Sequence, residues 1–357
     1  MNDYAVLVGI TNYPGIHNLD GAVNDVKNFE SWLLNEGGLL KENIKQVITR
    51  PPHSTNIADA TPVENDVKVE LTHIVSKGVE VMKADSDEEL RQKKMDFYRD
   101  ESGMLYLGRR LYFFLSGHGF AASFNPNDAS LIMANGDYGM YITNHINGVK
   151  YVDWFQAAAY FKEIVLVMDC CRTIEVGVPS LSPFRENREP TGKPVNCFYA
   201  LSTSYERISR EIDVNGKKQG AFTTLFLEAL RKAKPNSDNQ ITWEELKAYI
   251  WNNSTKHLPP GYTQEPQIRE SDSRHTIVLV NAVEEESHSL IFNFTADKIG
   301  KTAIILNGMF QQVKTLKITD ISLTINLPIG LYKIMIVGTE SSLQFEIAGE
   351  QSISLTI

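Results

Sequence analysis

Two short stretches place residues suited to nucleophilic chemistry directly after apolar runs. The stretch "FFLSGHG" sets His118 between two glycines, and "VLVMDCC" ends on Asp169, Cys170 and Cys171. In an open parallel sheet ligands bind at the carboxyl ends of the strands, so adjacent strands would bring these two ends together. A thiolate is the reactive form of cysteine, and a nearby imidazole can generate it. The pattern therefore predicts a cysteine nucleophile with a histidine base.

The two neighbouring cysteines are distinguished by the alternation of side chains along a strand. Asp169 and Cys171 should share one face, whereas Cys170 should point to the other. An isolated buried cysteine is far more often inert than catalytic. The joint occurrence of "SGHG" and "DCC" at two strand ends outweighs that general expectation. We therefore predict that Cys171 is the nucleophile and that Cys170 packs as a small hydrophobic residue.

The elements that would position these residues follow an α/β pattern up to about residue 270. The strand candidates are "YAVLVGI", "NIKQVIT", "LYFFLSG", "EIVLVMD" and "CFYALST". Each is apolar nearly throughout, which is typical of strands covered on both faces in a mostly parallel sheet. Helical periodicity lies between and after them, over residues 18–38, 63–100, 220–233 and 242–253. The sequence predicts an α/β domain with helices flanking the sheet.

The character of the chain changes after "VEEESHS" at residues 283–289. From there apolar and polar residues alternate, as in "LKITDISLTINLPIGLYKIMIVG", and the alternation slips at Asp320, where we expect a turn. We predict a linker over residues 273–288 and a small antiparallel, β-sandwich-like domain over 289–357. Such a module is more often a docking element than a catalytic one. A partner protein is the ligand class we expect for it.

Composition restricts the function classes. The chain has 357 residues, a formal net charge of -9 and no basic stripe, which argues against general nucleic-acid binding. Three cysteines, two of them adjacent, do not form a disulfide framework, so we expect a cytoplasmic protein. No apolar window approaches the length of a membrane span, and the start lacks the pattern of a signal peptide.

The two motifs resemble those of a known family. "FLSGHG" and "MDCCR" are similar to the His and Cys motifs of clan CD peptidases, specifically of the metacaspase and bacterial caspase-like branch of peptidase C14. The separation of about 50 residues between the two motifs is also that of caspase-type proteases. The likeness extends to "AVLVGITNYPGIHNLDGAVNDVKNFESWL", "NCFYALSTSYERISRE", "GAFTTLFLEAL" and "QEPQI", over roughly residues 1–272. It implies a six-stranded caspase-like peptidase domain over residues 1–272 that hydrolyses peptide bonds with a Cys-His dyad.

The resemblance also implies roles for individual residues. By position, His118 is the general acid/base, Cys171 is the nucleophile, and the backbone N–H groups of Gly119 and Cys171 are the oxyanion donors. Two departures stand out. Cys170 occupies a position where the family usually has serine, and "RT" follows Cys171 in place of "HSG", so the loop after the nucleophile should differ in shape.

Substrate preference is inferred from acids near the predicted strand ends. Metacaspases hold a substrate Arg or Lys with acidic pocket residues, and the matching residues are Asp25 and Asp169, with Ser202 beside the same pocket. Each acid also has a structural explanation, because Asp25 could favour a helix amino end and Asp169 could cap a turn. The rival is caspase-type cleavage after Asp, for which Arg210 would hold the substrate carboxylate. Two acids against one arginine favour a protein or peptide substrate with a basic residue at the cleavage site.

The same residues also bear on other functions and on cofactors. A catalytically inactive caspase-like scaffold remains an alternative, although such a scaffold need not keep both His118 and Cys171. A metal-dependent hydrolase is disfavoured because no pair of histidines has ligand spacing. We expect no cofactor; calcium activation, known for some metacaspases, is left open with no ligands assigned. Self-cleavage is expected in the Pro-rich segment 175–195, which offers Arg185, Arg188 and Lys193.

Overall fold

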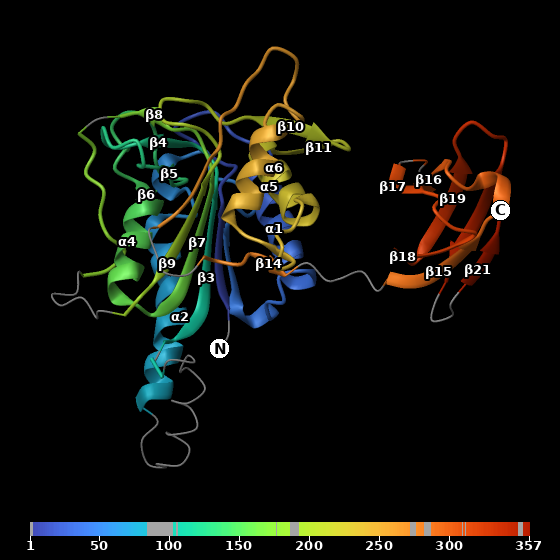
Figure 1. Cartoon of the computed structure of the whole chain (residues 1–357). Helices are drawn as coiled ribbons and strands as arrows, with labels where there is room; N and C mark the ends of the chain where they lie inside the picture. The colour runs from blue at the N-terminus through green and yellow to red at the C-terminus, as the bar shows by residue number, and fades with distance from the viewer. Residues whose placement is uncertain are drawn as a thin grey trace. The chain divides into compact units, whose positions relative to one another are not determined.

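A six-stranded sheet forms the centre of the first part of the chain (Figure 1). Its strands, in spatial order, are β13 (Gln267–Glu270), β9 (Asn196–Leu201), β7 (Phe161–Asp169), β3 (Gly108–Ser116), β1 (Tyr4–Gly9) and β2 (Ile44–Ile48). All neighbouring pairs are parallel except β13 with β9. The predicted mostly parallel, six-stranded α/β sheet is confirmed.

The computed structural model describes residues 3–83, 103–104, 106–175, 177–185, 193–271, 276–281, 287–308, 310, 312–348 and 353–357. Two compact units are distinguished, Met1–Asn281 and Ala282–Ile357. Within the described residues, no helix is long and apolar enough to cross a membrane.

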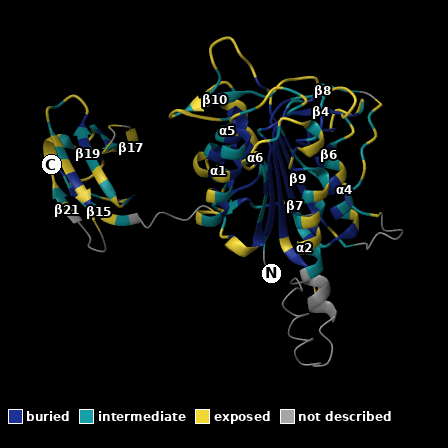
Figure 2. Ribbon diagram, turned by 180° about the vertical axis from the view of Figure 1, so that it is seen from behind, coloured by how far each residue is buried: buried dark blue, intermediate teal, exposed yellow. Residues whose placement is uncertain are grey.

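Helices cover both faces of the sheet, which explains why its strands are apolar throughout. Figure 1 shows α1 (Ala22–Asn35), α5 (Ala221–Lys232) and α6 (Trp243–Asn252) on one side, with α2 (Glu64–Lys83) and α4 (Gly148–Ala158) on the other. Each face has its own apolar core, and the central strands are the most deeply buried part of the unit (Figure 2). The expected helix over 63–100 is described only as far as Lys83.

Short elements complete the first unit. They are η1 (Lys41–Asn43), η2 (Ile57–Asp59), β4 (Gly119–Ala121), β5 (Ser130–Ile132), β6 (His145–Asn147), β8 (Thr173–Ile174), β10 (Glu211–Val214), β11 (Lys217–Gly220), β12 (Gln240–Ile241) and β14 (Val280–Asn281). Strands β4, β5, β6 and β8 form a small sheet directly after the ends of β3 and β7. The hairpin β10–β11 leads into α5.

Strand register aligns three carboxyl ends at one edge of the central sheet. Gly9, the last residue of β1, is opposite Ser116 at the end of β3, and Ser116 is opposite Asp169 at the end of β7. A Cβ on Gly9 would lie 2.7 Å from the carbonyl oxygen of Ala22, so only glycine permits α1 to approach this closely. The register and this close contact together bring the first turn of α1 to the ends of β3 and β7.

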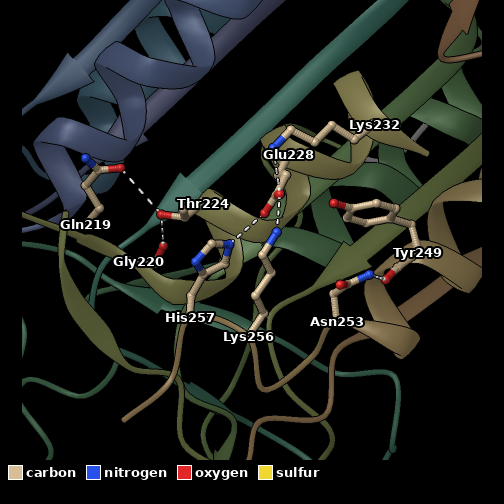
Figure 3. Close-up of polar contacts among 9 residues, drawn as sticks. All are labelled: Gln219, Gly220, Thr224, Glu228, Lys232, Tyr249, Asn253, Lys256 and His257. Carbon is tan, nitrogen blue, oxygen red and sulfur yellow. Dashed lines mark hydrogen bonds and ion pairs between the residues drawn. The ribbon is translucent and has the colours of Figure 1, made fainter. Parts of the chain in front are cut away.

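An ionic cluster fastens the segment after α6 to α5 (Figure 3). The carboxylate of Glu228 accepts from Lys232 Nζ at 3.0 Å and from His257 Nε2 at 2.7 Å, and it also contacts Lys256. Burial alone would raise the pKa of Glu228, but these hydrogen bonds lower it below its usual range. The cluster therefore anchors the start of the loop that runs from α6 to β13.

The second unit consists of two sheets that share one apolar core. One sheet contains β18 (Ser322–Pro328), β15 (Ser287–Asn293) and β21 (Ile353–Thr356); the other contains β17 (Gln312–Lys317), β16 (Thr302–Asn307), β19 (Gly330–Ile336) and β20 (Ser342–Ile347), with η3 (Ala296–Lys298) between β15 and β16. The pairs are antiparallel except β15 with β21. The predicted small antiparallel β domain is confirmed, and the slip in alternation at Asp320 falls in the connection between β17 and β18.

The first unit extends beyond residue 272, where we expected the linker to begin. Leu279 donates its N–H to Ile241 O at 2.9 Å as β14 pairs with β12, and Ile277 is fully buried. Residues 276–281 therefore pack as part of the α/β unit. The rest of the expected linker largely falls on residues 273–275 and 282–286, which lie outside the described part of the chain.

Two consecutive arginines at the start of β3 provide a test of this packing. Arg110 is 2% exposed and binds Glu163 Oε2 at 2.6 Å, Tyr112 Oη at 2.8 Å and Val278 O at 2.7 Å. Arg110→Met should lower the free energy of unfolding of the first unit by about 3 kcal/mol, because it leaves a half-buried carboxylate and a carbonyl without their cation. Chemical denaturation measures the change.

The matched control is the neighbouring Arg109, whose side chain is 49% exposed and pairs with Asp3. Arg109→Met should change the free energy of unfolding by less than about 1 kcal/mol, as is usual for surface ion pairs. Equal effects of the two substitutions would contradict the structural role assigned to Arg110.

Candidate active site

One cavity of about 670 Å³ opens at the aligned carboxyl ends of the central strands. It brings together four of the sequence-predicted residues, His118, Cys171, Asp25 and Asp169. Its remaining lining residues are His17, Asn18, Leu19, Ser116, Gly117, Tyr138, Thr173, Glu175, Ile208, Ser209, Arg210, Glu211 and Gly220. The cavity therefore combines a thiol, an imidazole and several carboxylates.

His118 is held by hydrogen bonds at its ring and at its backbone. Nε2 lies 2.8 Å from His17 O, and because a carbonyl only accepts, this nitrogen carries the proton and Nδ1 is left as the basic atom. The backbone N–H of His118 donates to Tyr13 Oη at 3.0 Å. Gly117 has φ +154°, and a Cβ there would lie 2.4 Å from that hydroxyl. Glycine at 117 thus permits the turn that presents the imidazole.

Burial keeps the imidazole neutral. It lowers the pKa of His118 to about 4, and the hydrogen bond to the His17 carbonyl opposes the shift only in part. At neutral pH the ring can therefore accept a proton at Nδ1.

The two adjacent cysteines lie in different environments. Cys170 is 2% exposed, belongs to the apolar core, and contacts Ser130 O through its Sγ at 3.8 Å. Cys171 is partly exposed, lines the cavity, and its Sγ lies 3.8 Å from Ser209 O. Burial raises the pKa of the Cys171 thiol above its ordinary value, so the thiol is protonated at rest. Deprotonation requires a base, and His118 lines the same cavity.

Asp25 and Asp169 form the most deeply buried acidic part of the cavity. Asp25 accepts from Ser116 Oγ and from the Gly220 N–H, both at 2.8 Å. Asp169 accepts from Ser209 Oγ at 2.6 Å and from the Thr223 N–H and Oγ1 at 2.9 and 2.8 Å. Burial raises the pKa of both carboxyls, and for Asp25 the neighbouring charge of Asp169 adds to the effect.

Gly220 leaves the space between the two carboxylates open. A Cβ at this position would lie 2.0 Å from Asp169 Oδ2 and 2.9 Å from Asp25 Oδ2. The backbone of Gly220 is extended, with φ -66° and ψ 131°, so any side chain would be acceptable there on backbone grounds alone. Space for the two acids, rather than backbone conformation, therefore explains the glycine.

Arg210 and Glu211 line the cavity at the start of β10. The guanidinium of Arg210 stacks on the ring of Tyr262, 3.9 Å from its centroid. Glu211 accepts from the Gly21 N–H at 2.6 Å, which ties this segment to the start of α1. Asp25 and Asp169 form an acidic wall of the cavity, and Glu211 adds a third carboxylate to it. The sequence had not indicated this role for Glu211.

Ser202 and Gly119 lie beside the cavity rather than among its lining residues. Ser202 is fully buried, and its hydroxyl donates to Cys170 O at 2.9 Å and accepts from Cys170 N–H at 3.2 Å. A Cβ on Gly119 would lie 2.7 Å from Cys170 Sγ. Both residues therefore fix the position of Cys170, and through it the start of the Cys171 loop.

Arg172 accounts for the departure after the nucleophile. It is 1% exposed and donates to Asp128 O at 3.0 Å, Thr203 O at 2.9 Å and Gln267 Oε1 at 2.6 Å. Burial lowers the pKa of Arg172 to about 10, so the guanidinium remains charged at neutral pH. The arginine holds the loop after Cys171 against three other segments of the first unit.

Several of the cavity's functional features have only a weak sequence signal. His17 contributes a backbone carbonyl, which every residue type has, and Ser209 contributes a hydroxyl, which several residue types share. Neither group gives a specific sequence signal. Glu211 in "ISRE" and Gly220 before "AFTT" can be read from the sequence, but no sequence pattern predicts that either lies close to Asp25. Among the described residues, no group of three or more His, Cys, Asp or Glu side chains is arranged to hold a metal ion.

Known proteins resemble the first unit. A probable protease from a Desulfuromonadales bacterium is 27% identical over 267 residues, covering 71% of this chain and 28% of that protein. This chain therefore spans less than a third of the length of that relative. Caspase-1 from Spodoptera frugiperda aligns structurally with 14% identity and a TM-score of 0.46, covering 79% of this chain and 91% of that one.

A family model supplies the assignment. The model described as the caspase domain of peptidase C14 matches residues 2–277, which is nearly the whole of the α/β unit that contains the cavity. The chain therefore belongs to the caspase-domain family of peptidases.

Proposed function

We propose that this protein is a cysteine endopeptidase that cleaves after Arg or Lys. The observation that carries the proposal is the cavity itself, in which two buried carboxylates flank Gly220 in the same space as a thiol and an imidazole. Family membership supports peptidase chemistry in general, and the acidic wall supports the choice of a basic residue.

The proposed reaction starts from a neutral pair. As the substrate carbonyl arrives, the Cys171 thiol gives its proton to His118 Nδ1 and the sulfur attacks the carbonyl carbon. The backbone N–H groups of Gly119 and Cys171 stabilise the oxyanion. The imidazolium then protonates the leaving amine, and an acyl-enzyme remains. Water, deprotonated by His118, attacks the acyl group and regenerates the thiol.

The His17 carbonyl supports the charged form of the base. Its contact with Nε2 at 2.8 Å persists when Nδ1 gains a proton, and a carbonyl binds imidazolium more strongly than neutral imidazole. The proposed chemistry uses only groups of the protein and needs no cofactor. Calcium activation stays a prediction without assigned ligands.

Binding of a basic side chain relieves the electrostatic cost of the acidic wall. Asp25 and Asp169 are desolvated and repel each other, and the hydrogen bonds they accept offset this only in part. A substrate guanidinium entering between them would pair with both carboxylates. A substrate Asp would meet further negative charge at this wall, which favours our reading over cleavage after Asp.

Arg210 is the residue that would hold the substrate carboxylate if the enzyme cleaved after Asp. It lines the cavity, but its guanidinium is already stacked on Tyr262. An inactive scaffold is the other alternative, and the retained thiol and imidazole in one cavity favour catalysis instead.

The second unit is a separate β domain that follows the part of the chain matched by the family model. We propose that it is an accessory module that docks a partner protein. The three cysteines are free thiols, which fits the cytoplasmic location we expect.

Removing either member of the dyad should abolish peptidase activity. Cys171→Ala and His118→Ala should reduce kcat/KM for an Arg peptide by at least about three orders of magnitude, because the nucleophile or its base is lost. Cys170→Ser should retain most of the activity, since Cys170 lies in the core. Iodoacetamide should label Cys171 in native Cys170→Ser protein and leave native Cys171→Ala protein unlabelled. Activity that survives in Cys171→Ala would refute the assignment.

Removing either acid of the wall should change specificity. Asp25→Ala and Asp169→Ala should each lower kcat/KM for Arg peptides by about one to three orders of magnitude, because a desolvated cation loses its partner. Alkylation of Cys171 should persist in both variants. The exposed Asp213, on the same β10–β11 hairpin as Glu211, is the matched control. Asp213→Ala should leave kcat/KM for Arg peptides unchanged.

Fluorogenic Arg, Lys and Asp peptides distinguish the two substrate classes. A preference for the Asp peptide that disappears only in Arg210→Ala would establish caspase-type cleavage in place of our proposal.

The pH profile should reflect the acids rather than the base. Arg binding needs ionised Asp25 and Asp169, whose pKa values are raised, so kcat/KM should fall as pH drops through those values. Burial lowers the pKa of His118 to about 4, so the imidazole is neutral at the pH where the activity is highest and can act as the base there. Asp25→Asn should shift the limb to lower pH, because it removes the carboxyl whose pKa is raised well above its ordinary value. An acid limb unchanged in this variant would assign it to another group.

Self-cleavage is proposed within residues 175–195. Glu175 lines the cavity, so this segment begins at the active site. Arg185 and Lys193 lie in its described parts, whereas Arg188 lies outside the described residues. Intact mass spectrometry of active enzyme should show two fragments with a boundary in this segment, and Cys171→Ala should give one uncut chain. Full activity from an uncut chain would rule out activation by cleavage.

A further inference from the structure

A second cleft, of about 410 Å³, adjoins the catalytic cavity. It shares Asn18 and Leu19 with that cavity. Its other lining residues are Thr11, Asp20, Val23, Lys27, Ile48, Thr49, Arg50, Pro51 and His53. Because two residues form a common wall, a chain leaving the cavity past Asn18 and Leu19 would enter this cleft.

The cleft lies over the carboxyl ends of β1 and β2, on the far side of β1 from the catalytic strands β3 and β7. Hydrogen bonds connect the segments that form its floor. The N–H of Thr11 donates to Thr49 Oγ1 at 3.1 Å, and that of Leu19 donates to Thr11 O at 2.9 Å. The floor is thus tied to the strand ends rather than formed by one isolated loop.

The charge of the cleft is opposite to that of the cavity. Lys27, Arg50 and His53 are exposed, and within the described residues none of them makes a salt bridge or a side-chain hydrogen bond. Asp20 is the single acid among the lining residues. A lysine, an arginine and a histidine therefore line the cleft together with one carboxylate. An anionic group would find available partners here.

The direction of the substrate follows from the proposed chemistry. The leaving amine takes its proton from His118, so the residues after the cleaved bond must depart on the side of that ring. His17, which holds the ring through its carbonyl, directly precedes Asn18 and Leu19 in the chain. The part of the substrate after the cleaved bond is therefore directed towards the basic cleft.

We propose that the basic cleft binds an acidic side chain among the first three substrate residues after the cleaved bond. This rests on the proposed cleavage after Arg or Lys, and it extends that preference to a basic residue followed closely by an acidic one. Lys27 and Arg50 are the residues that would hold the carboxylate.

The chain's own candidate cleavage segment has this arrangement. In "FRENREPTGKPV", Glu186 follows Arg185 and Glu189 follows Arg188, whereas proline follows Lys193. Both arginines in the segment are thus followed at once by an acid. The proposal predicts that self-cleavage uses an Arg–Glu bond and leaves the bond after Lys193 intact.

The expected effect is modest because the cations are exposed. Rim charges of this kind change rates by factors of about 3 to 20, and salt weakens their effect. The measurement uses quenched-fluorescence peptides that contain one Arg and carry Glu, Gln or Lys at each of the first three positions after it. The ratio of kcat/KM for Glu to that for Gln, taken within one enzyme, measures the contribution of the cleft.

Wild-type enzyme should prefer Glu over Gln by about 3- to 20-fold at one or more of these positions, and Lys should be the least favourable. The preference should shrink towards unity in the double variant Lys27→Gln and Arg50→Gln, and at high salt. Lys41→Gln is the matched control, since Lys41 is an exposed lysine immediately before β2 at its opposite end. It should keep the wild-type ratio.

A dye substrate that ends at Arg separates the two proposals, because it has no residue after the cleaved bond. Enzyme that cuts this substrate but shows a Glu-to-Gln ratio near one at all three positions overturns the cleft proposal alone. A ratio that survives in the double variant overturns it as well. Enzyme that prefers a dye substrate ending at Asp overturns cleavage after basic residues, and the cleft proposal with it.

Discussion

Two carboxylates buried close together are the constraint on which the site depends. Asp25 and Asp169 come from α1 and β7, and each is desolvated. They are held by donors from separate elements, which include Ser116 at the end of β3, Gly220 at the end of β11 and Thr223 in α5. A buried charge is tolerated only when such hydrogen bonds compensate for lost water. The acidic wall therefore requires the β1–β3–β7 register and the close approach of α1 and α5.

The same donors connect the acids with the catalytic groups. Ser116 binds Asp25 and is followed by Gly117 and His118, so the carboxylate and the imidazole are fixed by one turn. Ser209 binds Asp169 through its hydroxyl, and its carbonyl contacts the Cys171 thiol. A cation that pairs with the acids would thus act on residues that also contact the base and the nucleophile. The proposed substrate-binding acids and the proposed catalytic residues therefore share a single hydrogen-bonded framework.

Much of this arrangement could be predicted from local patterns. Apolar strands with polar ends gave the sheet and its functional edge, and strand alternation separated the buried Cys170 from the cavity-lining Cys171. The remainder depends on contacts between segments distant in sequence. Glu211 meets Gly21 and Arg172 meets Asp128 only after the chain has folded, and no periodicity encodes those contacts. For the same reason the limit of the first unit was set too early, because β14 is too short to show a strand pattern.

The departures from the family motif become intelligible through packing. Cys170 stands where serine is usual, and its Sγ lies in the core close to Gly119, an environment that suits a small apolar side chain. Arg172 replaces the usual histidine and inserts a guanidinium among backbone carbonyls of other segments. The side-chain oxygen of Gln267 also accepts from this guanidinium, and the nearby charge of Asp128 favours the charged form. The buried Arg172 therefore holds the loop after Cys171 in place, while Cys171 and Thr173 of the same loop line the cavity.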